Sequence, residues 1–423
     1  MNGFQNHTLE SGLRLIMVPM TNTKTITALI LVGTGSKYET KEINGISHFL
    51  EHMIFKGTIK RPGTMDIAQE LDSIGADYNA FTLKEHTGYY IKAGTQSTDL
   101  ILEVISDIFL NSKFDANEIE KEKGVISEEI NLYLDTPTRY INDLFEELLY
   151  GDQPAGWDIA GKKETISKFN RDDFVKYFET HYCANNTVIA IAGNIKPDLI
   201  HHKIEEYFKK TRQANKATKI SVLESQIEPQ IRLHYKKTDQ VHCSLGVRGY
   251  NMFDPKKEAI LLLGIIMGGN MSSRLFSEVR EKRGLAYYVS SGSEEYTDSG
   301  YFTTTTGVDI KRAKEALKVI LEEYRKIRDE KVSEQELKKA KEFIRGKTAI
   351  GLEGSDDLAS FYATQWLLKN ELLTPEQKLE KIMSVTTDQI QEIAQDIFKN
   401  EKLNLAVIGP FEKKDEFEEL IKL

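Results

Sequence analysis

Two histidines and a glutamate stand close together in the stretch HFLEH, which runs from His48 to His52 with Glu51 directly before the second histidine. On a helix, residues four apart lie on one face, so both imidazoles could bind the same metal ion. A catalytic zinc needs three protein ligands and an open position for water, and a nearby carboxylate can take that water's proton. The order H-x-x-E-H is an inverted zinc-peptidase motif, although so short a pattern also arises by chance on ordinary helices.

A third ligand could come from an acidic segment further along the chain, residues 117–135. Its candidate ligands are Glu118, Glu120, Glu122, Glu128 and Glu129. Glu122 and Glu129 are seven residues apart, two helical turns, and so lie on nearly one face. One of them could ligate while the other orients a ligand or the water. Spacing alone does not choose among these glutamates, which could equally form a solvated acidic face.

The elements that must position these residues fall into two related halves of the chain. Three pairs of segments match in the same order: residues 88–90 with 300–302, 114–126 with 332–344, and 170–198 with 386–415. The second pair opens on two capping-box patterns, and the third reads as a capped helix followed by a buried strand. This order indicates an internal duplication. We therefore expect a metal-binding catalytic domain at 1–212, a polar linker at 213–229, and a second, metal-free domain at 230–423.

Strands and helices are mixed within each half. The first half has strand-like runs at 25–35, 86–94 and 186–194, and the second at 241–250, 300–309 and 402–409. Long helical stretches such as 115–135 and 311–328 lie between them without a regular βαβ alternation. This arrangement predicts the α+β class, with a mostly antiparallel sheet packed with helices in each half.

The bulk composition is that of a globular protein with an acidic surface. The chain of 423 residues has a net charge of −9 and a pI near 5.7, without a basic stripe, so we expect no nucleic-acid partner. We expect no membrane span and no signal peptide, because no apolar run is long enough. Cys183 and Cys243 are too few for a disulfide framework, which favours a cytoplasmic location.

Several long segments together resemble the pitrilysin/insulinase family of zinc metallopeptidases, in particular the branch of this chain length that includes processing peptidases. They are HTLESGLRLIMV, GISHFLEHMIFKGT, GADYNAFTLKEHTGYY, EKEKGVISEEINLYLDTP and SSRLFSEVREKRGLAYYVSS. The resemblance implies that His48, His52 and Glu129 ligate one Zn²⁺ per chain. It further implies that Glu51 is the general base and that Glu122 orients a ligand or the water without binding the metal itself.

The same resemblance implies where a peptide substrate binds. Asn79, Ala80, Phe81 and Thr82 would form an exposed edge strand that pairs with the extended peptide. In the second half, Arg280 and Tyr287 would contact the substrate, with Tyr288 as the neighbouring alternative.

The second copy lacks every candidate ligand. Ala340 stands opposite Glu122, Lys347 opposite Glu129, and residues 260–264, ILLLG, opposite the histidine motif. We therefore expect one metal site, in the first half.

These features predict a zinc-dependent endopeptidase that hydrolyses unfolded peptides or small proteins inside a closed chamber formed by a homodimer. The alternative is a catalytically silent structural or assembly subunit of the same fold. Such subunits usually lose ligands, whereas His48, Glu51, His52 and Glu129 are all present here.

Overall fold

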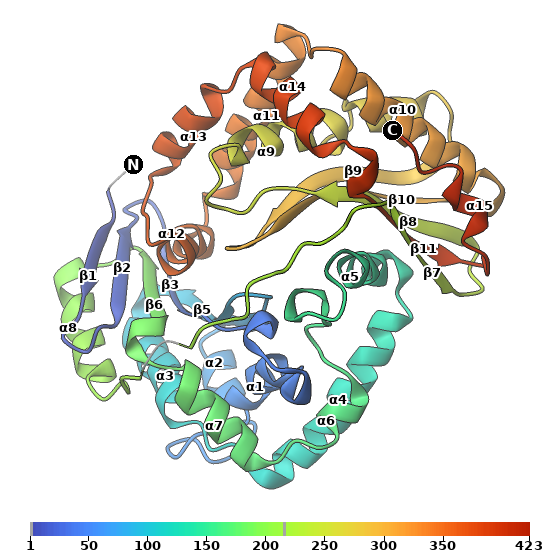
Figure 1. The fold of residues 1–423 in the computed structure, drawn as a ribbon. Helices are drawn as coiled ribbons and strands as arrows, with labels where there is room; N and C mark the ends of the chain where they lie inside the picture. The colour runs from blue at the N-terminus through green and yellow to red at the C-terminus, as the bar shows by residue number, and fades with distance from the viewer. Residues whose placement is uncertain (1–2, 215–216) are drawn as a thin grey trace. The chain divides into compact units, whose positions relative to one another are not determined.

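The structure, a computed structural model, describes residues 3–214 and 217–423 and divides the chain into two compact units (Figure 1). The first unit holds the chain up to Asn131, Trp157–Ile220 and Ala349–Leu373, and the second holds Leu132–Gly156, Ser221–Thr348 and Thr374–Leu423. No helix of the described residues is long and apolar enough to cross a membrane.

The sheet of the first unit has the strand order β1-β2-β6-β3-β5-β4. Its strands are β1 (Gln5–Thr8), β2 (Arg14–Pro19), β3 (Thr25–Val32), β4 (Asp77–Thr82), β5 (Thr87–Gly94) and β6 (Thr187–Gly193). Neighbouring strands are antiparallel except β2 and β6, which run parallel. The central strands β3 and β6 are rich in β-branched residues and almost fully buried, as expected for strands covered on both faces.

Helices cover both faces of this sheet. The helix α12 (Ser355–Lys369) lies across β2, β3 and β6, where its apolar side chains pack on Leu29, Leu31 and Val188 (Figure 1). The helix α3 (Thr98–Asn111) packs on the other face, where its Phe109 and the strand residue Tyr89 both contact the ring of Tyr182. The unit also contains α1 (Ile46–Ile54), α2 (Asp66–Asp72), most of α4 (Ala116–Leu134), α6 (Lys163–Ile166), α7 (Arg171–His181) and α8 (Pro197–Phe208).

The sheet of the second unit has the order β7-β11-β8-β10-β9. Its strands are β7 (Gln230–Tyr235), β8 (Gln240–Arg248), β9 (Ala286–Glu295), β10 (Gly300–Asp309) and β11 (Leu403–Gly409). The helix α9 (Lys257–Gly268) packs on β9, and α5 (Pro137–Tyr150) packs on β7, β8 and β11. The remaining helices are α10 (Ala313–Asp329), most of α11 (Glu334–Gly351), α13 (Pro375–Met383), α14 (Thr387–Ile397) and α15 (Asp415–Glu418).

The two sheets repeat one topology. The order β2-β6-β3-β5-β4 in the first unit corresponds to β7-β11-β8-β10-β9 in the second. The two parallel pairs also match in register. Arg14 aligns with Val188 and Gln230 with Asn404, and the same number of residues separates the partners in each pair. The predicted α+β class, with two related and mostly antiparallel sheets packed with helices, is confirmed.

The units are not simple halves of the chain. The helix α5 follows α4 in the first half of the sequence but packs on the sheet of the second unit, and α12 follows α11 but packs on the sheet of the first. Each unit therefore includes one helical segment that lies, in sequence, on the other side of the expected linker at 213–229. The apolar stripe of a helix shows that it must pack on something, but not on which sheet.

Candidate metal centre

The helix α1 carries His48, Glu51 and His52, as their spacing predicts. Gly45 precedes the helix with φ 99°, and a Cβ there would lie 2.7 Å from the carbonyl oxygen of Ala160, so the turn requires glycine. Phe49 is fully buried and its ring meets that of Phe174 on α7 at 4.8 Å. His48 is 8% exposed, and Glu51 and His52 are half-buried. The apolar side of α1 thus fixes the helix, while Glu51 and His52 stay partly accessible.

The carboxylate of Glu39 caps the N-terminus of α1. It accepts hydrogen bonds from the backbone N–H groups of Gly45 and Ser47, both at 2.8 Å, and from the side chain of Asn44 at 2.9 Å. Burial raises the pKa of Glu39, and these hydrogen bonds oppose that shift. The first N–H groups of a helix lack intrahelical partners and carry partial positive charge, so a carboxylate stabilises them. Glu39 was not predicted from the sequence, although an acidic residue shortly before a helix is a recognisable signal.

The helix α4 brings Glu129 to the two histidines. Its Oε2 lies 3.6 Å from Nε2 of His48 and 3.4 Å from Nε2 of His52. The three side chains offer ligand atoms that all lie within 4.8 Å of one another. Tetrahedral zinc with bonds of about 2.0–2.1 Å separates its ligand atoms by roughly 3.3–3.5 Å. His48, His52 and Glu129 therefore fit around one ion, and their two imidazoles and one carboxylate are a donor set that zinc favours.

Three other glutamates of α4, Glu118, Glu120 and Glu128, turn elsewhere. Glu128 is exposed and accepts a hydrogen bond from the side chain of Asn131 at 3.3 Å. Glu118 pairs with Lys121 and Glu120 with Lys123. The choice between Glu128 and Glu129, which spacing left open, is thus made by the rotation of the helix.

The electrostatics of this group favour a cation. The adjacent imidazoles of His48 and His52 hold the pKa of Glu129 well below its usual range, against its partial burial. Burial alone would lower the pKa of His52, but Glu122, Glu129 and the charge of Glu51 raise it to about 9. The surrounding carboxylates therefore stabilise positive charge at the point that His48, His52 and Glu129 share.

Glu122 orients one of the imidazoles. Its Oε1 lies 3.0 Å from Nδ1 of His52, and its Oε2 accepts a hydrogen bond from Nζ of Lys56 at 2.7 Å. These two partners lower the pKa of Glu122 although its burial acts in the opposite direction. A proton held on Nδ1 of His52 leaves Nε2 free to bind metal. Lys56 was not predicted, although it stands four residues after His52.

Glu51 lies on α1 between the two histidines but is not a member of the ligand group. Its charge acts on His52 and on two buried tyrosines, Tyr89 and Tyr182, whose hydroxyls are joined by a hydrogen bond of 2.7 Å. After burial, the Glu51 charge is among the causes that raise the pKa of both tyrosines. A carboxylate in this position can exchange protons without being bound to metal.

The segment from Asn79 to Thr82 lies in β4, an edge strand beside β5. The helix α1 packs against β4, so the strand runs beside the candidate ligands. The backbone N–H of Ala80 donates to its neighbour's side-chain oxygen, Oδ1 of Asn79, at 2.9 Å. This amide is not engaged by β5, so it is available to an added strand.

Arg280 and Tyr287 lie in the second unit and contact each other. Arg280 sits on a π-helical turn, Phe276–Glu281, a feature frequent at functional sites. Its guanidinium carbon lies 4.7 Å from the ring centre of Phe276 and 5.4 Å from that of Tyr287. Tyr287 is 76% exposed, whereas the hydroxyl of Tyr288 lies 2.9 Å from Nδ1 of His242. The cation–π contact thus pairs Arg280 with Tyr287, while Tyr288 has a separate partner.

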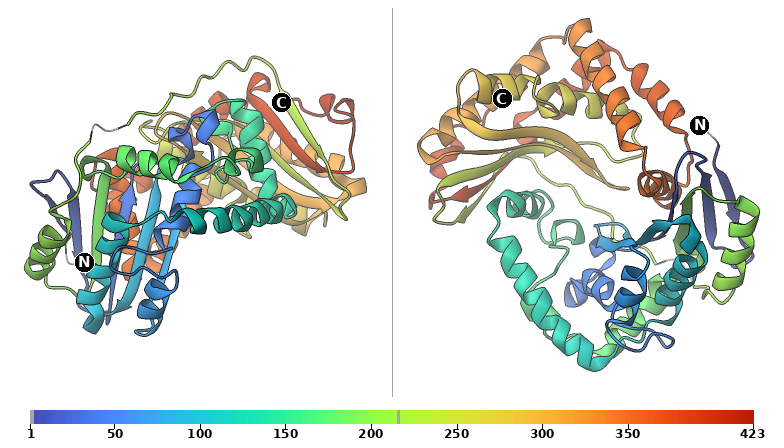
Figure 2. Two further views of the ribbon diagram at one scale, coloured as in Figure 1. Left: turned by 90° about the horizontal axis from the view of Figure 1, so that it is seen from below. Right: turned by 180° about the vertical axis from the view of Figure 1, so that it is seen from behind.

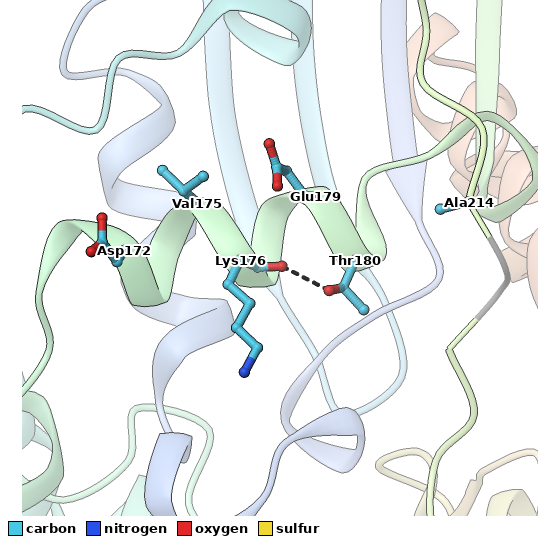
Figure 3. A pocket seen from close by; sticks show the side chains of 6 residues that line it. All are labelled: Asp172, Val175, Lys176, Glu179, Thr180 and Ala214. Carbon is cyan, nitrogen blue, oxygen red and sulfur yellow. Dashed lines mark hydrogen bonds between the residues drawn. The ribbon is translucent and has the colours of Figure 1, made fainter.

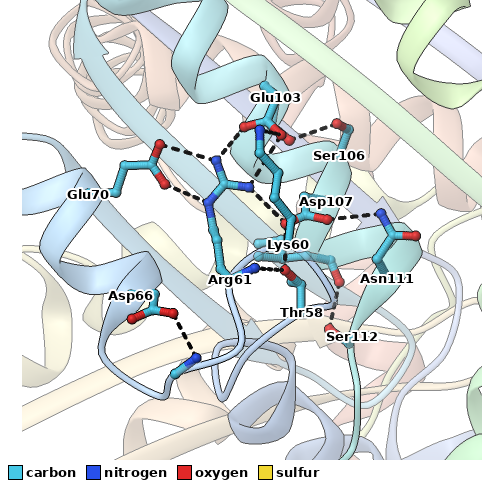
Figure 4. Close-up of polar contacts among 12 residues, drawn as sticks. Thr58, Lys60, Arg61, Asp66, Glu70, Glu103, Ser106, Asp107, Asn111 and Ser112 are labelled. Atoms are coloured by element: carbon cyan, nitrogen blue, oxygen red, sulfur yellow. Dashed lines mark hydrogen bonds and ion pairs between the residues drawn. The ribbon is translucent and has the colours of Figure 1, made fainter.

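A buried arginine fixes the segment that follows α1 (Figure 4). Arg61 is 4% exposed and donates hydrogen bonds to Glu70 of α2 and to Glu103 and Asp107 of α3. Burial alone would lower its pKa, but the three carboxylates raise it above the usual range. The network ties the loop after α1 to two other helices, so both ends of α1 are held.

The second unit has no counterpart to this group. Residues 260–264 lie on the buried helix α9, and Ala340 and Lys347 lie on α11. Among the described residues, the groups of histidine and acidic side chains close enough to hold a metal both lie in the first unit: His48, His52 and Glu129, and His201, His202 and Glu205.

A hollow of about 510 Å³ lies beside α7, away from these groups (Figure 3). It is lined by exposed side chains such as Asp172, Lys176 and Glu179, and the hydroxyl of Thr180 bonds to the carbonyl oxygen of Lys176 within the helix. Its charged groups do not converge on one point, so it is not a candidate catalytic site.

Comparison with known families finds matches across both halves of the chain. Residues 15–163 match the family described as Insulinase (Peptidase family M16), and residues 168–344 match the Peptidase M16 inactive domain. His48, His52 and Glu129 all fall in the first match, and the second match contains none of these three residues.

Curated relatives match over nearly the full length. The chain is 34% identical to the uncharacterized zinc protease YmxG of Bacillus subtilis (strain 168), over 96% of this chain and 98% of that protein. It is 32% identical to the uncharacterized zinc protease SCO5738 of Streptomyces coelicolor, over 96% of this chain and 90% of that protein.

Solved structures share the fold. A protease from Helicobacter pylori matches with a TM-score of 0.91 and 22% identity, over 96% of this chain and 99% of that one. A peptidase M16 inactive domain from Pseudomonas fluorescens matches with a TM-score of 0.89 and 18% identity, over 97% of this chain and 98% of that one.

Proposed function

The chain belongs to the insulinase family, peptidase family M16, and we propose that it is a zinc-dependent endopeptidase that cleaves unfolded peptides or small proteins. The observation that carries the proposal is the convergence of His48, His52 and Glu129, with Glu51 beside them on α1. The names of the curated relatives, uncharacterized zinc proteases, agree with it.

Each residue of the centre has a proposed role. His48, His52 and Glu129 would hold one Zn²⁺ per chain, which would polarise the scissile carbonyl and acidify the attacking water. Glu122 holds the ring of His52 through Nδ1, which would leave Nε2 free to bind the ion. Glu51 accepts the proton of the attacking water and returns it to the leaving amine.

The proposed substrate is an extended peptide that adds to β4. Asn79, Ala80, Phe81 and Thr82 supply the strand, and the backbone N–H of Ala80 exchanges its bond with Asn79 for one with the peptide. Backbone pairing of this kind makes little demand on sequence, which suits a peptidase with many substrates.

The second unit would contribute to substrate binding and turnover. Arg280 would donate hydrogen bonds to a substrate carbonyl, and the exposed hydroxyl of Tyr287 would stabilise the developing oxyanion. A homodimer enclosing a chamber would restrict substrates to unfolded chains, and light scattering of the purified protein measures the oligomeric state.

The decisive experiment replaces Glu51 with glutamine. We expect the Glu51→Gln variant to keep its zinc, because Glu51 is outside the ligand group, and to lose peptide cleavage by about 100-fold or more. Zinc content is measured by metal analysis, and cleavage on a pool of unfolded peptides. Equal cleavage by the variant and the parent would overturn the mechanism.

Two neighbouring glutamates of α4 provide a test of the ligand set and its matched control. Glu129→Gln removes a proposed ligand and should lose both zinc and activity, whereas the exposed Glu128→Gln should change neither. A parent protein that binds zinc but cleaves no peptide would favour the silent structural subunit.

A further inference from the structure

A second cluster of potential ligands lies at the far edge of the first unit's sheet. His201, His202 and Glu205 on α8 offer ligand atoms within 4.8 Å of one another. A third imidazole, that of His7 on β1, lies beside this group, since the ring centres of His7 and His201 are 4.6 Å apart. The strands β1 and β2 and the helix α8 lie side by side in both further views (Figure 2). The three potential ligands of α8 and the neighbouring imidazole of His7 thus come from two elements distant in sequence.

The side chains of this group touch through their rings, with the ring centres of His201 and His202 6.0 Å apart. Within the described residues, the side chains of His7, His201, His202 and Glu205 make no hydrogen bond. Nδ1 of His201 lies 3.8 Å from Oε2 of Glu205, which is too far for a hydrogen bond. The neighbouring cation, Lys203, pairs with Asp99 of α3 at 3.0 Å.

The spacing is close to that of the centre on α1. There, the carboxylate oxygen lies 3.4 and 3.6 Å from the two imidazole nitrogens, and the separation of 3.8 Å between His201 and Glu205 is slightly larger. Small rotations of exposed side chains bring such atoms to the roughly 3.3–3.5 Å that tetrahedral ligands require. Imidazoles with one carboxylate select divalent ions such as Zn²⁺, Co²⁺ and Ni²⁺.

We propose that His7, His201, His202 and Glu205 form a second divalent-metal site, which clips the edge strand β1 to α8. All residues of β1 are exposed, and the strand lies at the edge of the sheet beside β2. A metal bound by His7 on one side and α8 on the other holds this strand in place. An edge strand that is held down is also less available for pairing with other chains.

The test counts bound Zn²⁺ after equilibrium dialysis at micromolar free metal. The parent chain should bind two Zn²⁺, and the His201→Ala/His202→Ala variant, in which α1 is intact, should bind one. Glu205→Ala should weaken the second site, whereas Glu206→Ala, an exposed glutamate one residue on, is the matched control and should not. Equal binding by the parent and the double variant would overturn the site, whatever the stoichiometry of the parent.

Hydrogen exchange tests the clip separately from binding. Zn²⁺ should slow exchange of the β1 amides in the parent but not in His7→Ala, and unchanged exchange in a parent that binds two ions would overturn the clip. The double variant should cleave peptides at the parental rate. Failure of this site therefore leaves a signature different from failure of the proposed peptidase centre.

Discussion

The side chain of Glu122 stands between two donors, Nδ1 of His52 at 3.0 Å and Nζ of Lys56 at 2.7 Å. Glutamine at this position keeps the size but turns an amide nitrogen toward one of them. We expect Glu122→Gln to bind zinc roughly 10–100-fold more weakly, because the His52 ring loses its fixed tautomer. Competition with a chelator measures the affinity. Glu120→Gln, exposed on the same helix and paired with Lys123, should be neutral, and an equal loss in both would contradict this role.

His181 should make the fold sensitive to acid. It is 6% exposed at the end of α7, and burial lowers its pKa to about 4. In the unfolded chain a histidine titrates near about 6.5, so the unfolded state takes up the proton first as the pH falls. Stability should therefore decline between about pH 6.5 and pH 4, by up to roughly 1.4 kcal/mol per pH unit for this group.

The variant His181→Phe isolates that contribution. Phenylalanine suits a site beside Tyr177, whose ring centre lies 4.2 Å from that of His181. Urea unfolding at a series of pH values, with chelator present, should show a shallower acid-side decline in the variant. Parallel curves for the two proteins would show that His181 is not the cause.

At this scale, residue spacing accounts for much of the geometry of the candidate centre. The spacing of His48 and His52 placed both imidazoles on one helix face, and the seven-residue interval from Glu122 to Glu129 placed two carboxylates on another. Spacing did not separate Glu129 from Glu128, because the rotation of α4 about its axis depends on what its apolar residues pack against. Glu39 was missed for a related reason, since its hydrogen bonds follow a loop path that local periodicity does not encode.

At the scale of elements, α1 depends on a carboxylate outside it. Glu39→Gln keeps the shape but leaves one oxygen, so a backbone N–H of Gly45 or Ser47 loses its acceptor. A buried donor without a partner costs about 1–3 kcal/mol. We therefore expect a lower melting temperature and weaker zinc binding, because α1 carries the histidines.

The control for this capping role is close by. Glu42→Gln removes the same charge from an exposed residue three positions on and should leave melting temperature and zinc affinity unchanged. A Glu39→Gln variant that melts and binds zinc like the parent would contradict the cap.

The strands themselves were easier to predict than the order in which they pair. The β-branched runs in β3 and β6 identify buried strands, and the matching segments of the second half predicted a second sheet. The strand order was not predictable, because β2 pairs in parallel with β6, and the aligned residues, such as Arg14 and Val188, are far apart in sequence.

At the scale of the whole molecule, the exchanged helices predict that neither half folds alone. A fragment ending at Ile220 lacks α12, whose Leu358, Tyr362 and Trp366 form part of the first unit's core. We expect this fragment to aggregate or to show no cooperative unfolding by circular dichroism, because its sheet keeps one apolar face uncovered.

Cutting the chain in the exposed linker after folding gives the complementary result. A protease site placed at Ser225 should yield two pieces that stay together in gel filtration, since each completes the core of the other's unit. Co-expression of the two fragments should restore solubility and zinc binding to the first. A soluble, cooperative fragment ending at Ile220 would contradict the need for α12.

The late position of α12 has a consequence for synthesis. The candidate metal ligands have all been synthesised once Glu129 has left the ribosome, but the sheet beside them is not covered until residues 355–369 have followed. Domains generally fold in the order of synthesis, and here the first unit cannot close until most of the second has been made. A prematurely terminated chain would therefore carry the candidate ligands on a sheet whose apolar face is still uncovered.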